Sequence, residues 1–175
     1  MIKSGDYQYI LLTDGTAELT NYTAYAEFLT VPAQIDGHAV TSIGSEALIN
    51  SEFLSSIILP DCLTTIGIDA FCGCSFHTSI TLPNSLTSIG NGAFAGCESL
   101  TRSILPSSLT SIEAWAFSGC ESLASITLPD SLTTIGNWAF KSCPVSLNFT
   151  AVRGSWAESW CKENGKNYTY SNSID

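Results

Sequence analysis

The chain has 175 residues, of which 45% are hydrophobic and 13% are charged, and this balance excludes an intrinsically disordered protein. Six Lys and Arg residues against sixteen Asp and Glu residues give a formal net charge of −10, so we expect no nucleic acid partner. The apolar runs are too short to span a bilayer, and direct membrane insertion is not expected. The length predicts one domain over 1–175, with an N-terminal cap over 1–28, coils over 29–150 and a C-terminal cap over 151–175.

The N-terminal segment predicts a β-hairpin. Residues 1–8 contain one lysine and no apolar stretch, so no signal peptide is expected within this chain. Two β-prone runs, Tyr7 to Leu12 and Ala17 to Thr20, are separated by Asp14-Gly15, a dipeptide that favours a hairpin turn. We expect this hairpin to cover the open end of the segment that follows.

The middle of the chain repeats with a period of 23 residues. A proline, an isoleucine, an alanine, a phenylalanine and a cysteine recur at that spacing in four units: LPDCLTTIGIDAFCGC, LPNSLTSIGNGAFAGC, LPSSLTSIEAWAFSGC and LPDSLTTIGNWAFKSC. An imperfect earlier copy begins at Val31. The sequence therefore predicts about five coils.

A 23-residue period is too short for paired-helix repeats and is typical of a leucine-rich coil. Each unit opens with β-prone residues such as Ser125-Ile126-Thr127-Leu128, and the following proline ends the strand because it has no N–H to donate. We expect the rest of each unit to return as turns or a short irregular helix. Since one coil cannot bury its own apolar face, several must stack. We therefore predict a repeat solenoid of the α/β class, β-dominated, wound as a right-handed leucine-rich coil.

The C-terminal segment predicts a short helix. Ser155 and Glu158 have the spacing of a capping box, and Gly165 is expected to end the helix. Trp156 and Trp160 are four residues apart, so they share one face of this helix. We expect that face to pack on the last coil.

The recurring LPxSLTxIGxxAFxGC pattern resembles the BspA-type leucine-rich repeat family of bacterial surface proteins. The flanking segments YQYILLTDGTAELTNYT and GSWAESWCKENGKNYTY are also similar to the ends of that family. The resemblance implies a non-enzymatic protein, secreted or on the cell surface, that adheres to a host or neighbouring cell. Its partner would be a surface or matrix protein or a glycan. The resemblance carries over no catalytic residue and no cofactor.

The chain has seven cysteines, and four of them recur with the repeat: Cys74, Cys97, Cys120 and Cys143. We predict that these four are small buried fillers of the core. Parallel stacking leaves their Cβ vectors side by side, which disfavours disulfides between coils. Reduced cysteines favour a reducing or anaerobic setting, which is in tension with secretion unless the habitat is anaerobic.

Catalytic and metal sites are not expected. The two histidines, His38 and His77, lie in different coils, and neither has a recurrent carboxylate partner, so a hydrolytic Ser–His–Asp site is disfavoured. Cys72-Gly73-Cys74 lacks the spacing of a zinc motif. Polar residues follow the repeat prolines: Asp61, Asn84, Ser107 and Asp130. We expect them to satisfy turn backbone groups rather than to hold calcium.

Trp115 and Trp138 are 23 residues apart and are therefore expected to be neighbours on adjacent coils. The equivalent upstream residues are Asp69 and Gly92, so the core does not require tryptophan at this position. A second equivalent pair lies in the following loops: Glu98 and Glu121. Together these residues predict a site that binds a protein or stacks on sugar rings. In the alternative interpretation both indoles simply pack along the outer wall or on the C-terminal cap.

A second candidate surface is the outward face of the strands. If Ile80 and Ile126 point inward, alternation turns their neighbours outward. The outward residues would be Ser79, Thr81, Arg102, Ser125 and Thr127. Such a face suits an extended protein or a glycan rather than a small molecule. Ser103 stands where Ile80 and Ile126 stand, which leaves the register of its strand open.

Two functional alternatives remain open at this point. The absence of a signal peptide from this chain and the reduced cysteines favour an intracellular scaffold of the same fold. Trp115 and Trp138 favour a glycan-binding module. The oligomeric state is not fixed by the sequence.

Overall fold

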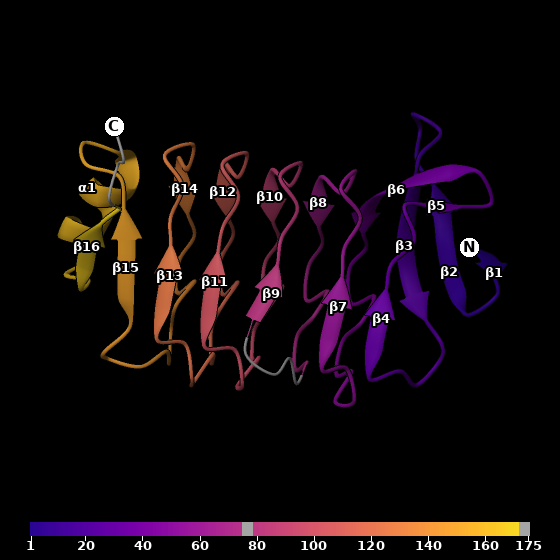
Figure 1. Cartoon of the computed structure of the whole chain (residues 1–175), viewed down its shortest axis with the longest axis horizontal. Coiled ribbons are helices and arrows are strands. Elements are labelled where there is room, and N and C mark those ends of the chain that lie inside the picture. The colour runs from indigo at the N-terminus through magenta and orange to yellow at the C-terminus, as the bar shows by residue number, and fades with distance from the viewer. Residues whose placement is uncertain (75–78, 172–175) are drawn as a thin grey trace.

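The computed structural model describes residues 1–74 and 79–171, in which coils of chain stack along one axis (Figure 1). One face carries a row of parallel strands that we call the front row. Its first two strands form one small sheet and its last five form another: β4 (Phe28–Thr30), β7 (Ser56–Ile58), β9 (Ser79–Thr81), β11 (Arg102–Ile104), β13 (Ser125–Thr127), β15 (Asn148–Ala151) and β16 (Tyr168–Tyr170). In Figure 1 these strands lie nearer the viewer and run upward, and the chain returns behind them while it advances from right to left. This sense of winding makes the coil right-handed, as predicted.

The opposite face carries a second parallel sheet, which corrects one expectation. The LTxIG segments do not return as turns or irregular helix but contribute two strand residues per coil: β8 (Thr65–Ile66), β10 (Ser88–Ile89), β12 (Ser111–Ile112) and β14 (Thr134–Ile135). The reason is hydrogen bonding between coils. The Thr87 N–H donates to the Thr64 carbonyl at 2.9 Å, and the Gly90 N–H donates to the Ile66 carbonyl at 2.9 Å. A turn would leave these backbone groups without a partner in the neighbouring coil.

The N-terminal hairpin is confirmed. β2 (Tyr7–Leu11) and β3 (Ala17–Tyr22) pair antiparallel, and Gly15 in the turn has a φ of +83°. β3 then pairs in parallel with β6 (His38–Ile43), so the hairpin covers the first coil. Two short strands were not predicted: β1 (Ile2–Ser4), which pairs with β2, and β5 (Gln34–Ile35), which pairs with β6.

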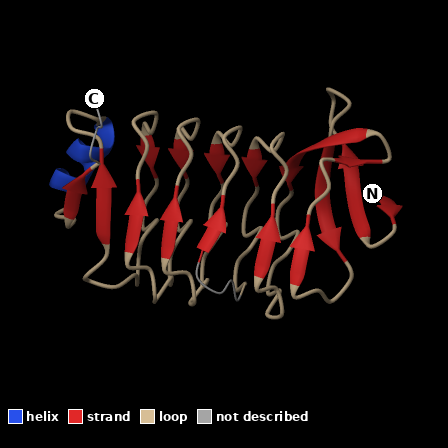
Figure 2. Ribbon diagram, in the orientation of Figure 1, coloured by secondary structure: helices blue, strands red, loops and turns tan. Residues whose placement is uncertain are grey.

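The C-terminal cap is confirmed as a helix, the only one among the described residues, at the far end of the strand-rich stack (Figure 2). Helix α1 spans Trp156–Glu163. The Ser155 hydroxyl accepts a hydrogen bond from the Glu158 N–H at 3.1 Å, and the Glu158 carboxylate accepts one from the Gly154 N–H at 2.5 Å. Gly165, with a φ of +58°, lies just beyond the helix end. These contacts satisfy N–H groups that a helix start otherwise leaves unpaired.

The two helix tryptophans behave differently. Trp160 packs on the last coil as expected, with ring centroids 6.0 Å from Phe140 and 5.7 Å from Phe149. Trp156 is exposed, contrary to the expectation that both would pack there. The two residues are four apart and therefore offset by about 40° around the helix, and this offset leaves only Trp160 facing the coil.

The core is built from ladders of equivalent residues. The rings of Phe71, Phe94, Phe117 and Phe140 stack with centroids 5.2 to 5.6 Å apart and interplanar angles of 6° to 16°. Each Phe ring thus packs on the rings of its neighbouring coils, and stacked pairs contribute about 0.5–1.5 kcal/mol beyond the burial of their area.

The repeat cysteines do more than fill space. Cys97 donates its S–H to the Phe71 carbonyl at 3.3 Å, and Cys120 donates to the Phe94 carbonyl at 3.2 Å. Each thiol therefore satisfies a carbonyl of the preceding coil. All seven cysteines are free thiols, and burial raises the pKa of the Cys120 thiol to about 12.

The register of the third repeat strand is now settled. Arg102 in β11 pairs with Ser79 on one side and with Ser125 on the other, which is the register of the neighbouring coils. Ser103 consequently points into the core, where it is 1% exposed. Its hydroxyl has no hydrogen-bond partner among the described residues.

Candidate interaction surfaces

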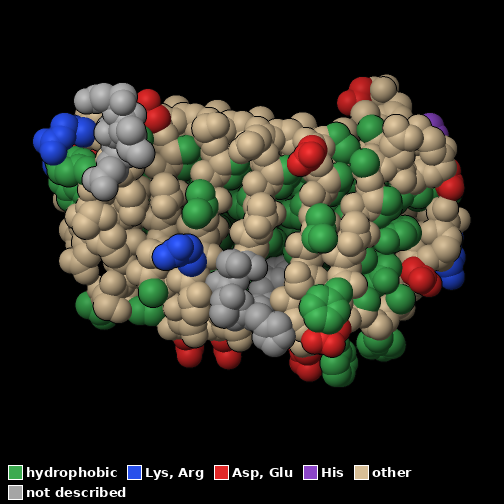
Figure 3. All heavy atoms as spheres, viewed as in Figure 1, with side chains coloured by type: hydrophobic (Ala, Val, Ile, Leu, Met, Phe, Trp, Pro, Cys, Tyr) green, Lys and Arg blue, Asp and Glu red, His purple; other side chains and the backbone are tan. Residues whose placement is uncertain are grey.

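The front row presents a face of small and apolar side chains with few charges across its middle (Figure 3). Arg102 and Thr81 are exposed, and Ser125 and Thr127 are half-buried. Only the backbone of Ser79 is described. Ile80 and Ile126 are buried beneath this face, as the predicted alternation requires. The outward residues lie on paired strands and are therefore held in a fixed register.

Apolar side chains add to this face. Ile58 and Ile104 are each 62% exposed, and Phe28 at the free edge of β4 is also exposed. Large aliphatic and aromatic side chains that remain in contact with water on a rigid surface are typical of places where a partner binds.

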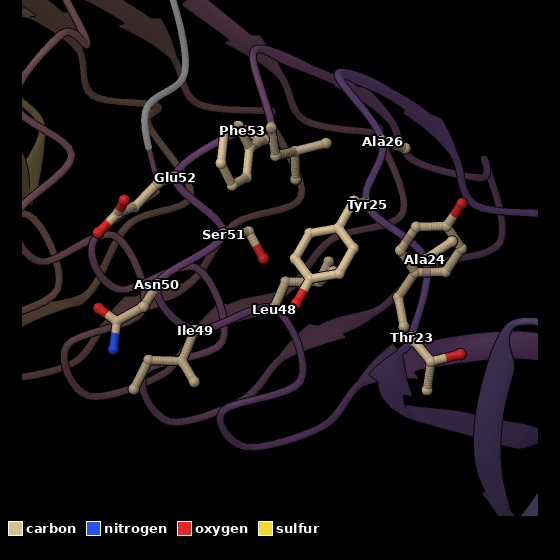
Figure 4. Close-up of a pocket in the computed structure, with 12 residues that line it drawn as sticks. Thr23, Ala24, Tyr25, Ala26, Leu48, Ile49, Asn50, Ser51, Glu52 and Phe53 are labelled. Carbon is tan, nitrogen blue, oxygen red and sulfur yellow. The ribbon is translucent and has the colours of Figure 1, made fainter.

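A hollow near the N-terminus was missed by the sequence reasoning. Its volume is about 260 Å³, and it lies between residues 22–26 and 48–54 (Figure 4). Tyr25 is 92% exposed and Phe53 is 67% exposed, and their rings meet edge to face with centroids 6.1 Å apart. The sequence signal was weak, because Phe53 aligns with a phenylalanine in the next coil and with serines in the two coils after it, and Tyr25 lies outside the regular repeat.

The structure brings Trp115 and Trp138 together. Their ring centroids are 4.9 Å apart, with an interplanar angle of 40°. Trp115 is half-buried, whereas Trp138 is 60% exposed. The charged group beside the pair is Lys141, whose Nζ lies 4.8 Å from the centroid of the Trp115 ring. Two other residues of the predicted site lie in the turns that follow and are fully exposed: Glu98 and Glu121.

The backbone at the two tryptophans is left-handed. Trp115 has a φ of +60° and Trp138 a φ of +56°, and the equivalent residues have similar values in Glu46, Asp69 and Gly92. The coil itself therefore imposes this conformation, which costs an L-residue about 1–2 kcal/mol and costs glycine little. Tryptophan is consequently not the residue that the backbone of the coil favours here.

A second hollow separates the last coil from helix α1, and we call it the C-terminal hollow. Its volume is about 430 Å³. Aromatic, amide and cationic side chains line it: Trp138, Trp160, Asn137, Asn164, Lys141 and Lys166. The sequence predicts that the helix packs on the last coil, but it does not show which side chains border the space between the two.

The described structure places one of the two histidines, His38. The Nδ1 atom of His38 lies 2.8 Å from the Gly15 carbonyl oxygen, so this side chain ties the hairpin turn to the first coil. His77 lies outside the described residues. Among the residues that are described, no three His, Cys, Asp or Glu side chains gather closely enough to hold a metal ion. No described helix has the length and apolar character needed to cross a bilayer.

The architecture is that of a leucine-rich β-solenoid closed by a hairpin and a helix, and comparison of the sequence defines the family. The family model described as "BspA type Leucine rich repeat region" matches residues 41–156 in six copies. The chain therefore belongs to the BspA-type leucine-rich repeat family. The family model counts six copies where the sequence predicts about five coils over 29–150, and β15 keeps the register of β13.

Solved bacterial proteins share this fold. The leucine-rich repeat protein of T. pallidum is 33% identical with a TM-score of 0.80, over 85% of this chain and 70% of that one. A leucine-rich cell surface protein of Faecalibacterium prausnitzii A2-165 is 27% identical with a TM-score of 0.54, over 86% and 54%. A leucine-rich repeat protein of Bacteroides ovatus ATCC 8483 is 26% identical with a TM-score of 0.51, over 87% and 56%. No protein with a curated function matches this sequence.

Proposed function

We propose that this chain is a non-enzymatic protein–protein interaction module of a bacterial cell-surface or secreted protein. It adheres to a host or neighbouring-cell surface or matrix protein through the front row. The similar protein of F. prausnitzii is described as a cell surface protein, which supports this location. The observation that carries the binding function is the rigid front row with its exposed aliphatic side chains, Ile58 and Ile104.

The geometry of the front row favours a large partner. Seven strands about 4.8 Å apart and about three residues long give a face of roughly 34 Å by 10 Å, or about 340 Å². A specific interface usually buries about 800 Å² on each partner. The strands alone are too small, so the interface extends to the neighbouring exposed aromatics, Tyr25 and Phe53. Exposed tyrosine and phenylalanine side chains are suited to act as anchors at such an edge.

The rigidity of the face contributes to affinity. Ile80 and Ile126 lock the strands from below, and each strand is hydrogen-bonded to its neighbours. A surface that is already ordered loses little conformational entropy when a partner binds. The chain therefore needs few anchor contacts to bind tightly.

A double substitution on the front row tests this proposal. We expect Ile58→Asp with Ile104→Asp to weaken binding to surfaces coated with collagen, laminin or mucin at least tenfold. The matched control places the same charges on the opposite sheet, as Ser88→Asp with Thr134→Asp, and should bind like the wild type. Equal binding by the front-row variant and the wild type would refute the assignment of this face, as would failure of the wild type to bind any of these surfaces.

The alternative of an intracellular scaffold uses the same fold. It rests on the seven free thiols, which suit a reducing compartment. The location of the chain in native cells separates these two proposals.

A further inference from the structure

The C-terminal hollow combines features that the front row lacks. It is a concave space of about 430 Å³, within the range of small-molecule sites. The front row carries two smaller hollows, of about 330 and 360 Å³, and neither is lined by an aromatic side chain. We propose that this hollow binds an anionic saccharide, meaning a pyranose sugar that carries a carboxylate group. No residue that lines this site belongs to a front-row strand, and the proposal does not depend on the function proposed for the front row.

The charge distribution is the first argument. The chain has six cationic residues against sixteen acidic ones. Two of the six, Lys141 and Lys166, line this hollow. In the part of the chain that is described, Glu158–Lys162 is the single ion pair, so neither of these lysines has a described carboxylate partner. Lys141 contacts the Trp115 ring, so its ammonium group is held in place without being neutralised. An acidic protein that places two ammonium groups without a described carboxylate partner around one hollow provides a local attraction for an anion.

The open face of Trp138 is the second argument. One side of its indole is covered by Trp115, with the ring centroids 4.9 Å apart. Trp138 lines the hollow, and Trp115, one coil earlier, does not. The Trp138 side chain is 60% exposed. An exposed indole on a fixed backbone offers a flat apolar surface on which the C–H groups of a pyranose ring can pack.

The amides are the third argument. Asn137 and Asn164 line the same hollow, and the Asn164 amide N–H₂ donates to the Trp160 carbonyl at 2.9 Å, which fixes its orientation. The remaining amide groups can donate to and accept from sugar hydroxyls. A flat aromatic surface, amides and two ammonium groups therefore match the apolar face, the hydroxyls and the carboxylate of one ligand.

The left-handed backbone at Trp138 is consistent with this role. The coil imposes a positive φ at this position in every repeat, and glycine, which adopts it without strain, occupies the position as Gly92 with a φ of +62°. Trp138 adopts a φ of +56°, so its large side chain is present although the backbone favours glycine. An acidic peptide would engage the lysines but has no ring face to place on the indole, which is why we favour a sugar.

Calorimetric titration of the full chain tests the proposal with defined probes. The probes are digalacturonate and sialyllactose as two carboxylated sugars, lactose as the neutral control, lactose sulfate as a different anion, and a tetraglutamate peptide. We expect at least one carboxylated sugar to bind at least tenfold more tightly than lactose, lactose sulfate and the peptide. Raising NaCl from 50 to 300 mM should weaken that binding severalfold.

Matched variants locate the binding. Trp138→Ala, and Lys141→Met with Lys166→Met, should each weaken carboxylated-sugar binding at least tenfold. Trp156→Ala, an exposed tryptophan on α1 outside the hollow, should bind like the wild type. Trp138→Gly relieves the left-handed backbone and serves as a folded replacement if the alanine variant is unstable.

Three outcomes overturn the proposal. They are binding of lactose or the peptide as tight as that of the carboxylated sugars, binding that survives both hollow variants, and no binding of any sugar by the wild type at millimolar concentration. None of these outcomes changes the result expected for the front-row variants. Saccharide binding by the C-terminal hollow and protein binding by the front row can therefore be refuted independently.

Discussion

Ser103 offers a substitution that should stabilise the protein. It is the polar member of a core ladder that contains Ile80 and Ile126, it is 1% exposed, and its hydroxyl has no described partner. We expect Ser103→Ile to raise the free energy of unfolding. The change adds three buried carbon atoms, a gain of about 2.4 kcal/mol at about 0.8 kcal/mol each. It also removes an unpaired hydroxyl, whose burial costs about 1–3 kcal/mol.

Crowding opposes part of this gain. Extra methylene groups in a packed core cost about 1–3 kcal/mol, so the net stabilisation is about 0.4–4.4 kcal/mol. For a chain of this length that corresponds to a rise in Tm of roughly 1–18 °C. Chemical and thermal denaturation followed by circular dichroism measure both quantities.

Two variants complete this experiment. Ser103→Ala removes the hydroxyl without adding volume and should stabilise by about 1 kcal/mol. Ser125→Ile, on the outward face of the next strand, should change stability by no more than about 0.5 kcal/mol. Destabilisation by both Ser103 variants would show that the hydroxyl has a partner, and the reasoning would be refuted.

Three further predictions follow from the core and the caps. Phe94→Ala should cost about 3–5 kcal/mol in denaturant unfolding, because its fully buried ring stacks on two others; a loss below 1 kcal/mol would contradict that packing. Hydrogen bonds from Lys162, the Gly154 N–H and Tyr170 lower the pKa of Glu158 to about 2 from its ordinary value near 4.5. These hydrogen bonds make their full contribution to the free energy of unfolding above pH 4.5, and the contribution is lost as the pH falls towards 2. Glu158→Gln should abolish this pH dependence of stability in acid titrations. A thiol reagent at pH 8 should rapidly modify only Cys62 and Cys72 in the native protein, because burial raises the pKa of the other five thiols to about 11 or higher. Fast reaction of a third cysteine would contradict this explanation.

The sequence was most informative where equivalent residues touch. The 23-residue period places each Phe on the next Phe and each Cys beside the preceding coil, so the period alone predicts the core ladders. The capping box at Ser155 and the Asp14-Gly15 turn were also predictable, since both depend on residues only a few positions apart.

The sequence was least informative where structure depends on the docking of unlike segments. The two-residue strands such as β10 (Ser88–Ile89) are too short to show an alternation of their own and exist because the coils on both sides supply hydrogen bonds. The C-terminal hollow joins Trp138 to Asn164 and Lys166 across the junction between coil and cap. The hollow beside Tyr25 and Phe53 likewise lies between an irregular segment and a turn.

Protease shaving of intact native cells, followed by mass spectrometry, tests most directly whether this chain acts at the cell surface. Released peptides of the chain, without peptides of a cytosolic marker, are the predicted result. Recovery of the chain only after lysis would contradict a surface or secreted adhesion module and would favour a scaffold that binds its partners inside the cell.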